Sequence, residues 1–399
     1  MLHVGVGVSS SAQADEATHQ ALSNASDRLG VEKPAFVLLF ASSKYNQELV
    51  FRTAREQLGA DMPILGGSTA GEIGPSGPSQ SASVVCMMVA GSGITARVKT
   101  IEAANEQPEE KARAIIASLV AEGIAPELLC MVADGLAVNP NALLRGIQAV
   151  APALPVVGGS SGDDGQYKQT YQYGASGVLS KSASFLALSG DLRFAVGVRH
   201  GWNPISGPKK ITKASGTVIH EIDGKPAIQL YEEFVGVAEA ATLKEKTLAT
   251  LALSYPLGLK DATSGEMLLR APFYVDAAGS ITCGGEVVEG SDVQLMMGSK
   301  EEAIEAARES ARKAVSDLGT KPAAAVLFNC HVRDTLFASR DEAKKEIDAI
   351  QEVIGSDVPL VGFYTYAEQA PINGLNYNMQ SCANTNHNET IVILLLAAK

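Results

Sequence analysis

The chain repeats one short pattern three times: Pro63-Ile-Leu-Gly66-Gly67-Ser68, Pro155-Val-Val-Gly158-Gly159-Ser160 and Pro359-Leu-Val-Gly362-Phe363-Tyr364. An apolar run lies upstream of each copy, ending at Ala41, Ala133 and Asn329. The spacing from the end of that run to the first glycine is 25, 25 and 33 residues. An acidic residue follows six positions after each first glycine: Glu72, Asp164 and Glu368. Such spacing indicates one structural unit used three times.

The residues around these runs predict the rest of the unit. Apolar residues recur at helical intervals between the two runs of each copy, in 46–58, 140–150 and 340–354. Amphipathic helices are expected before each first run (14–29, 108–122, 300–318), and apolar strands after each glycine turn (83–90, 182–188, 390–396). We therefore predict an α/β fold of tandem repeated strand-helix-strand units, with additional β-strands forming mixed sheets, in two domains.

The third unit is separated from the second by residues 192–290, which have the composition of strands with one helix. Within them, Ala252-Leu-Ser-Tyr-Pro-Leu-Gly258 resembles a degenerate fourth unit. The turn signal Asp223-Gly224 gives a plausible boundary. We expect residues 1–223 to form a ligand-sensing domain with two units, and residues 224–399 to form a domain with one intact and one degenerate unit.

Composition narrows the range of partners. Of 399 residues, 46% are hydrophobic and 19% charged, which predicts packed domains. The net charge of −12 has the wrong sign for nucleic acid or an anionic membrane. The apolar stretch 391–398 is too short to span a bilayer, and the N-terminus lacks a signal-peptide pattern, so we expect a cytoplasmic protein. Five scattered cysteines without a Cys-x-x-Cys pair indicate neither a disulfide framework nor a zinc site.

The carboxyl ends of the repeated strands are the expected ligand site, because parallel strands joined by a helix end at one edge of a sheet. The candidate ligand contacts at these ends are Ser68, Thr69, Glu72, Asp134, Cys330, Arg333, Tyr364 and Glu368. Arg333 stands out because a guanidinium can clamp a carboxylate with two hydrogen bonds. The alternative is a salt bridge to Glu368 or Glu72. We expect the ligand to lie where the sheet edges of the two domains face each other.

Metal binding and catalysis have weaker signals. The candidate metal or haem ligands are His331, His200 and His387, and the alternative for each is an ordinary hydrogen-bonded histidine. Gly158-Gly-Ser160-Ser-Gly162 matches the nucleophile elbow of serine hydrolases, in which a helix follows the serine. A polar stretch follows instead, so the repeat explains Ser160 better than catalysis does. Cys330 fits a buried core cysteine better than a nucleophile. We expect a protein that is not an enzyme.

Several further stretches occur in the order of a known family: His200-Gly-Trp202-Asn-Pro204, Glu221-Ile-Asp-Gly-Lys-Pro-Ala227, Tyr255-Pro-Leu-Gly258, Gly279-Ser-Ile-Thr-Cys283, Phe328-Asn-Cys330-His-Val-Arg333 and Gly362-Phe-Tyr-Thr-Tyr-Ala-Glu368. Together with Pro63-Ile-Leu-Gly-Gly-Ser-Thr-Ala-Gly-Glu72, they resemble the FIST N and FIST C domains of bacterial sensory proteins over nearly the whole chain. The chain departs from the family pattern at Ala367, where a glycine usually precedes the acid, and at His331, where a small residue is commoner.

The resemblance implies a small-ligand-binding sensory protein in bacterial signal transduction. An amino acid is one implied ligand, and Arg333 would then hold its carboxylate. Many family members are fused to an output domain. Because the resemblance covers nearly this whole chain, we expect a free-standing sensor that acts on a separate histidine kinase or cyclic-di-GMP enzyme. Some free-standing members bind haem and sense nitric oxide, so haem b is the alternative ligand. The chain has no Cys-x-x-Cys-His motif for covalent haem.

Overall fold

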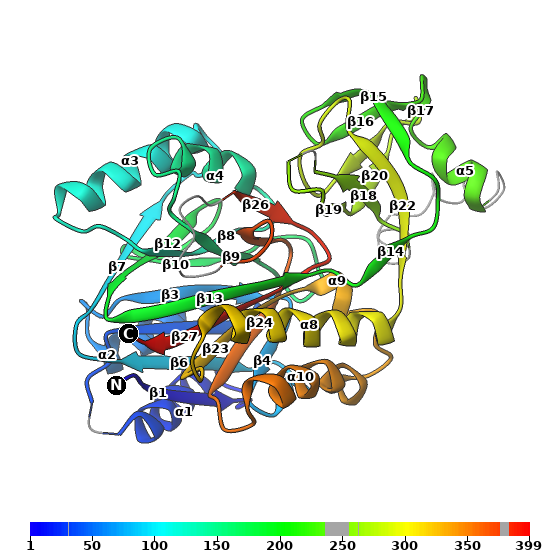
Figure 1. Cartoon of the computed structure of the whole chain (residues 1–399). Coiled ribbons are helices and arrows are strands. Elements are labelled where there is room, and N and C mark those ends of the chain that lie inside the picture. Colours follow the sequence, from blue (N-terminus) through cyan, green and yellow to red (C-terminus); the bar gives the residue numbers. More distant parts are fainter. Residues whose placement is uncertain (31, 236–254, 262, 376–382) are drawn as a thin grey trace.

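Three units of the computed structural model share one order of elements (Figure 1), and the model describes residues 1–399 except 31, 236–254, 262 and 376–382. The first unit comprises β1 (His3–Ser9), α1 (Ala14–Leu29), β2 (Phe36–Ser42), α2 (Gln47–Leu58), β3 (Ile64–Thr69), β4 (Glu72–Gly74), β5 (Gly77–Pro78) and β6 (Val84–Ala90). The second comprises β7 (Ile94–Ile101), α3 (Pro108–Ala121), β8 (Leu128–Asp134), α4 (Pro140–Gln148), β9 (Val156–Ser161), β10 (Gln172–Gly174), β11 (Gly177–Leu179) and β12 (Ala183–Gly190).

The third unit has the same order but is interrupted after its first strand. It comprises β13 (Leu192–Arg199), α8 (Lys300–Leu318), β23 (Ala324–Cys330), the short α9 (His331–Asp334), α10 (Arg340–Ile354), β24 (Leu360–Thr365), β25 (Glu368–Pro371), β26 (Asn384–His387) and β27 (Ile391–Ala398). In each unit the second and third strands pair in parallel, and the first glycine of the repeated pattern faces Leu39, Met131 or Leu327. The predicted repeat and fold class are therefore confirmed.

The first glycine of each pattern is required by close packing of backbones. A Cβ atom at Gly66 would lie 1.7 Å from the carbonyl oxygen of Leu39, and one at Gly158 would lie 1.9 Å from that of Met131. No side chain fits at these distances, which is why the repeat keeps glycine there. Helix ends follow local rules as well. The side chain of Asn46 caps α2 by accepting a hydrogen bond from the Leu49 amide at 3.0 Å.

The units exchange hairpins in a ring. Strand β4 of the first unit pairs with β24 of the third, β10 of the second pairs with β3 of the first, and β25 of the third pairs with β9 of the second. The result is three six-stranded mixed sheets, ordered β1-β6-β2-β3-β10-β11, β26-β25-β9-β8-β12-β7 and β13-β27-β23-β24-β4-β5. Each sheet therefore contains strands from two units, and no unit completes its sheet alone.

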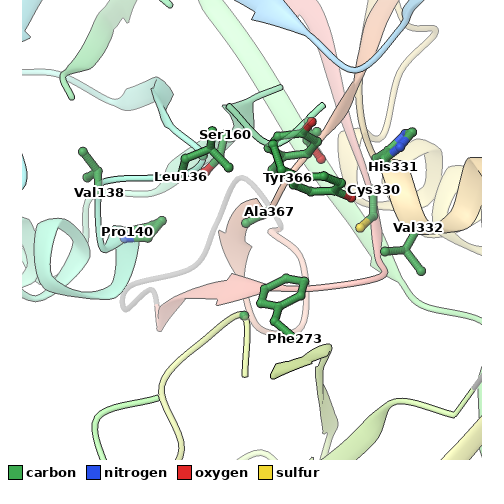
Figure 2. A pocket seen from close by; sticks show the side chains of 14 residues that line it. Leu136, Val138, Pro140, Ser160, Phe273, Cys330, His331, Val332, Tyr366 and Ala367 are labelled. Atoms are coloured by element: carbon green, nitrogen blue, oxygen red, sulfur yellow. The ribbon is translucent and has the colours of Figure 1, made fainter. Parts of the chain in front are cut away.

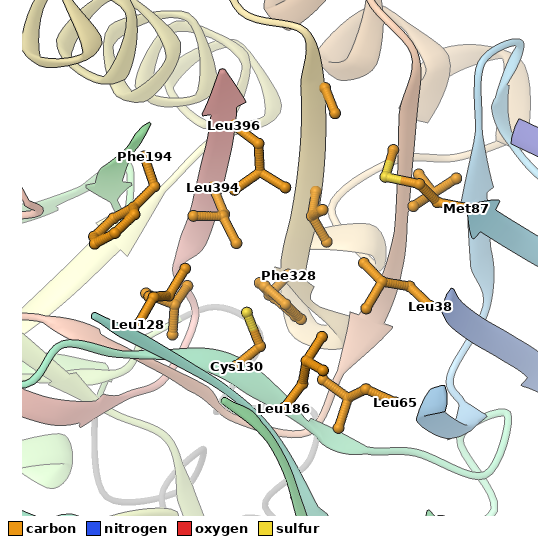
Figure 3. Packing of buried hydrophobic residues seen from close by; sticks show 14 of the residues in the cluster. Leu38, Leu65, Met87, Leu128, Cys130, Leu186, Phe194, Phe328, Leu394 and Leu396 are labelled. Carbon is orange, nitrogen blue, oxygen red and sulfur yellow. The ribbon is translucent and has the colours of Figure 1, made fainter. Parts of the chain in front are cut away.

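One apolar core lies at the centre of the three sheets. Figure 3 shows side chains from all three sheets converging there, among them Leu38, Leu128 and Phe328. The outer face of each sheet is covered by its own helices, which bury three further clusters against α1 and α2, α3 and α4, or α8 and α10. Both faces of the central strands are consequently buried, so these strands read as continuous apolar runs in the sequence.

A buried side chain fastens each exchanged hairpin. Glu72 receives hydrogen bonds from the hydroxyls of Thr69 and Ser83 (2.6 Å for Ser83), and Glu368 is bonded to the hydroxyl of Thr365 and the amide of Thr390 (3.2 Å). Strand pairing places Glu72 opposite Phe363, Glu368 opposite Gly159, and Gln172 opposite Gly67. These positions are equivalent because each partner directly follows the first glycine of its pattern.

Gln172, and not Asp164, is thus the counterpart of the two glutamates. Ten residues, 162–171, connect β9 to β10, whereas two residues connect the equivalent strands of the other units, and this longer segment displaces the acid from the repeat. The side-chain amide of Gln172 is hydrogen-bonded at the equivalent place, accepting from the Ser182 hydroxyl at 2.8 Å and donating to the Thr170 hydroxyl at 3.2 Å. All three side chains thus fasten their hairpins through buried hydrogen bonds. Burial raises the pKa of Glu72 to about 7 and that of Glu368 to about 8.

The described residues of 202–298 (202–235, 255–261 and 263–298) form a separate structural body inserted between β13 and α8 (Figure 1). Its nine-stranded sheet contains β14 (Trp202–Pro204), β15 (Lys209–Ser215), β16 (Val218–Ile222), β17 (Lys225–Pro226), β18 (Leu257–Lys260), β19 (Met267–Arg270), β20 (Pro272–Val275), β21 (Ile281–Cys283) and β22 (Asp292–Gly298), and α5 (Gln229–Val235) packs nearby. We call this body the insertion. It has an apolar cluster of its own.

The expected domain boundary lies inside the insertion, between β16 and β17, which pair with each other. The division at residues 223 and 224 stays a prediction. Residues 252–254 of the expected degenerate unit lie outside the described residues, and its described end contributes to β18, which pairs antiparallel with β19 and β22. Among the described residues, no helix is both long and apolar enough to cross a membrane.

The protonated glutamates should make stability fall as the pH rises. Because the folded-state pKa values of Glu72 and Glu368 are raised, the folded chain keeps protons that the unfolded chain loses above about pH 4.5. Each group then lowers the free energy of unfolding by about 1.4 kcal/mol per pH unit, up to its folded pKa. The double variant Glu72→Gln, Glu368→Gln copies Gln172 and should remove this slope between pH 5 and 8, which urea denaturation at several pH values measures.

The variant Glu48→Gln is the control, because Glu48 is exposed on α2. It should keep the slope of the parent protein. A double variant whose pH profile runs parallel to that of the parent would show that the two glutamates are ionised in the folded state.

Candidate functional site

A cavity of about 230 Å³ lies among the second unit, the third unit and the insertion (Figure 2). It opens at the carboxyl ends of β8, β9, β23 and β24, where the sequence places its polar strand ends. The lining residues are Gly135, Leu136, Val138, Pro140, Ser160, Tyr167, Phe273, Gly284, Cys330, His331, Val332, Thr365, Tyr366 and Ala367. The strand ends of the second and third units thus build the cavity, and residues of the insertion close it.

Backbone bonds hold the cavity wall together. The amide of Ser160 donates to the carbonyl of Ala367 at 2.7 Å, and the amide of Tyr366 donates to the carbonyl of Ser160 at 3.1 Å. These bonds join the turn after β24 to the end of β9. Gly135 passes so close to this seam that a Cβ atom there would lie 2.3 Å from the carbonyl oxygen of Ser161. Glycine is therefore needed where the loop after β8 begins.

Two stacked tyrosines form one side of the cavity. The rings of Tyr167 and Tyr366 lie 4.7 Å apart at 12°. The hydroxyl of Tyr366 donates to the carboxylate of Asp163 and accepts from the amide of Gly165 at 3.1 Å. Burial acts to raise the pKa of Asp163, but hydrogen bonds from Tyr366 and three backbone amides hold it below its usual value. Asp163 is therefore ionised, and it holds the extra segment of the second unit against Tyr366.

The lining itself is polar in places but uncharged. Burial lowers the pKa of His331, so this imidazole is neutral near pH 7, and its Nδ1 atom is buried without a hydrogen-bond partner. Burial also raises the pKa of the Cys330 thiol well above its usual value, which keeps the sulfur protonated and a poor nucleophile. Among the described residues that line the cavity, none is a lysine, arginine, aspartate or glutamate.

Arg333 does not line the cavity. Its side chain is fully buried and forms an ion pair with Glu346, which is also fully buried. The same guanidinium donates to Asn329 Oδ1 at 3.0 Å and to the carbonyls of Ala303 (2.8 Å) and His200. The salt bridge that the sequence offered as an alternative exists, but with Glu346 rather than with Glu368 or Glu72. Arg333 joins β23, α8, α10 and the start of the insertion.

Six other candidate ligand contacts do not line the cavity, and five of them make hydrogen bonds within the protein. Thr69 and Glu72, like Glu368, belong to the hairpin fastenings described above. Asp134 accepts from the amides of Leu136 and Ala137, both at 2.9 Å, and so shapes the loop that borders the cavity. Ser68 donates to the carbonyl of Gly162 at 2.7 Å, and Tyr364 is fully buried. Among the candidate ligand contacts, Cys330 alone lines the cavity.

The three candidate histidines are not gathered around one site. His331 lines the cavity. His200 Nδ1 accepts from the amide of Trp202 at 3.0 Å, and burial lowers its pKa to about 4. His387 is buried, its Nε2 lies 3.3 Å from the carbonyl of Ala370, and burial lowers its pKa to about 3. Within the described part of the chain, no group of three or more His, Cys, Asp or Glu side chains is arranged to hold a metal ion.

Haem does not fit this arrangement. The cavity is smaller than the roughly 300 to 1,000 Å³ typical of pockets for drug-sized ligands, and a porphyrin is at least that large. Only one of the candidate axial histidines, His331, reaches it.

Ser160 lies on the cavity wall without the surroundings of a nucleophile elbow. Its hydroxyl accepts a hydrogen bond from the Gln369 amide at 3.1 Å. Strand β9 ends at Ser161, and the next regular element is the strand β10, so no helix follows the serine. The serine hydrolase alternative thus lacks the local structure that the motif requires.

Sequence reasoning missed the aromatic and insertion residues of the cavity. Tyr366 was within the repeated turn, but Tyr167 belongs to the extra segment of the second unit, and Phe273 and Gly284 belong to the insertion. Nothing in their local sequence connects them to the repeated strand ends. The Gly284-Gly285 pair was the only local signal of a close approach.

Removing Arg333 should destabilise the protein strongly. Arg333→Ala leaves the carboxylate of Glu346 buried without its partner, which typically costs about 3–5 kcal/mol. Lys321→Ala is the matched control, because Lys321 pairs with Asp357 on the surface, where both side chains are more than 65% exposed, and such pairs contribute about 0–1 kcal/mol. Urea denaturation of both variants measures the difference. An Arg333→Ala protein as stable as the control variant would contradict the structural role.

Comparison with known proteins identifies two domains. A FIST N domain matches residues 35–225 and a FIST C domain matches residues 227–371. An uncharacterized protein of Mycobacterium tuberculosis is 25% identical over 383 residues, covering 94% of this chain and 96% of the relative. An uncharacterized protein of Methanocaldococcus jannaschii is 35% identical over 82 residues, covering 21% of this chain and 16% of the relative.

Two of the solved structures that resemble the whole chain are named as enzymes. A cyanuric acid hydrolase from A. caulinodans has a TM-score of 0.38 and 12% identity, and the match covers 100% of this chain and 99% of the other. A chorismatase has a TM-score of 0.35 and 7% identity, with 100% and 99% covered. These matches contradict the expectation that the chain is not an enzyme, and we withdraw it. At this similarity they assign no reaction to this chain.

The two domain matches span most of the sequence and fall on the repeated units and the insertion. The chain therefore belongs to the FIST family, whose domains are sensory domains for small ligands.

Proposed function

We propose that this FIST protein is a sensory protein that binds a small uncharged molecule in the cavity between the second unit, the third unit and the insertion. The uncharged lining carries the proposal, because a buried charged ligand would need an opposite charge beside it. Apolar surface comes from Leu136, Val138 and Phe273. Hydrogen bonds would come from the polar lining side chains of Ser160 and His331.

An amino acid is a less suitable ligand for this cavity. Its carboxylate would need a cation, and the guanidinium of Arg333 is already bonded to Glu346, Asn329 and two carbonyls. A positively charged side chain of another residue would have to move into the cavity. A neutral ligand needs no such rearrangement, so we favour a neutral molecule that has an apolar part and at least one hydrogen-bonding group.

The proposed signal passes from the cavity to a separate output protein in the cytoplasm, of the histidine kinase or cyclic-di-GMP enzyme class that the family resemblance implies. The cavity wall contains residues of the second unit, the third unit and the insertion. A ligand that contacts all three therefore favours one arrangement of the insertion relative to the two units. An output protein that recognises this arrangement would read the ligand state. The haem-based nitric oxide alternative predicts a Soret absorption band, which we do not expect from the purified protein.

Filling the cavity should abolish ligand binding without unfolding the protein. Leu136 is 40% exposed and lines the cavity, so Leu136→Trp adds bulk where solvent can accommodate the rest of the ring. The control is Val150→Trp at a position that is 51% exposed and not part of the lining. After incubation with a bacterial metabolite extract, native mass spectrometry should detect a small bound molecule on the parent protein and on Val150→Trp only. The same bound mass on Leu136→Trp, or no bound mass on any of the three proteins, would refute the proposed site.

A further inference from the structure

The outer wall of the cavity belongs to the insertion. Phe273 and Gly284 come from β20 and from the segment after β21, whereas every other lining residue comes from the second or third unit. Figure 2 shows Phe273 pointing toward Tyr366 and Ala367 from the opposite side. Access to the cavity therefore depends on where the insertion lies relative to the three units.

The insertion packs as one body. Its apolar cluster contains residues of the insertion only, among them Ile219, Leu257 and Leu295. It joins the rest of the chain at two adjacent connections, between Arg199 and Trp202 and between Gly298 and Lys300. The strands at these connections, β14 and β22, pair with each other. Two neighbouring connections to a separately packed body are the usual arrangement of a hinge.

An apolar contact marks the hinge side. Trp202, Leu269 and Met296 pack together at the base of the insertion, and Leu336 of the third unit packs against them. The guanidinium of Arg333 lies over the Trp202 ring at 5.7 Å. This contact stays near the connections, so it can persist while the far side of the insertion moves.

Polar bonds mark the opposite side. Glu286 of the insertion forms an ion pair with Arg145 at 2.5 Å and accepts from the Asn139 amide at 2.8 Å. Arg145 is itself held by Glu109 at 2.7 Å. Arg145 is 48% exposed and Glu286 27%, and pairs this exposed to solvent are weak and screened by salt. Arg270, bonded to the carbonyl of Asn386 at 3.3 Å, is a second polar contact across this interface.

We propose that the insertion is a hinged lid over the cavity, and that Glu286, bonded to Arg145 and Asn139, is the latch that holds it shut. This inference rests on the proposed function in one respect: the lid would control access to the same cavity. The lid turns about the contact of Trp202 with Leu336, and opening separates Phe273 and Gly284 from the rest of the lining. A bound ligand, by contacting Phe273, favours the closed arrangement.

The test uses Cys330 as a reporter of access. Cys330 lines the cavity beneath the lid, whereas Cys86 lies in the central strand β6 and reacts only when the protein unfolds. The full-length protein is treated with N-ethylmaleimide, and modification of each cysteine is followed by peptide mass spectrometry. In Glu286→Lys, repulsion from Arg145 opens the latch, so Cys330 should react several-fold faster than in the parent while Cys86 does not change.

Asp357→Lys is the matched control, because it reverses an acid whose ion pair with Lys321 lies away from the latch. It should leave both rates unchanged. Raising the salt concentration should speed the reaction of Cys330 in the parent protein but not in Glu286→Lys, because salt weakens the attraction between Glu286 and Arg145 in the parent and the repulsion from Arg145 in the variant. Arg145→Gln removes the cation that Glu286 shares with Glu109 and should speed the reaction of Cys330 in the same direction, so it provides a second test if Glu286→Lys also speeds Cys86.

An unchanged Cys330 rate in both latch variants would overturn the lid. The measurement needs no ligand, so it is independent of the mass-spectrometric test of the proposed function. Fluorescence gives a second readout, because Trp202 is the single tryptophan of the chain and lies at the hinge. The emission wavelength of Trp202 should be the same in the latch variants as in the parent, because the contact of Trp202 with Leu336 remains. A shift typical of an exposed indole would contradict a hinge at Trp202.

Discussion

The apolar inner faces of three sheets cover one another, and the rest of the molecule depends on this burial. A strand-helix-strand unit can cover only the outer face of its sheet with its own helices. The inner face, with side chains such as Leu38, Leu128 and Phe328, needs apolar partners from elsewhere. Closing three units into a ring supplies them. The exchange of hairpins then ties each sheet to its neighbour, so that the three units form one structure.

Ring closure also explains the buried acids. A hairpin that leaves its own unit must be fixed at the point where it crosses, and hydrogen bonds to a buried side chain do this. Gln172 makes these bonds as an amide, and Glu72 and Glu368 make them as carboxyls whose pKa values burial raises to about 7 and about 8. The two acids that the sequence places among the ligand contacts are hydrogen-bonded within the fold. The same holds for Arg333, whose charge is balanced by Glu346 in the interior.

The cavity lies where the repetition is broken. The extra segment 162–171 contributes Tyr167, the insertion contributes Phe273 and Gly284, and the departure from the family pattern at His331 contributes an imidazole. The repeated parts build the scaffold, and the unrepeated parts give the site its shape and polarity. A ring of three similar units thus acquires one particular cavity, and that cavity is closed by a body that packs separately from the ring.

The sequence alone determined the repeated unit, because a buried strand needs a continuous apolar run and close backbone packing needs glycine, as at Gly66 and Gly158. The family assignment followed from the order of its motifs. Only the tertiary structure decided which strand end meets which. Phe273 and Tyr366 face the same cavity although 93 positions separate them (366 − 273). The packing of β23 against α10 likewise decided that Arg333 pairs with Glu346 rather than with a ligand. Local sequence does not encode this ion pair, because it forms between elements that ring closure brings together.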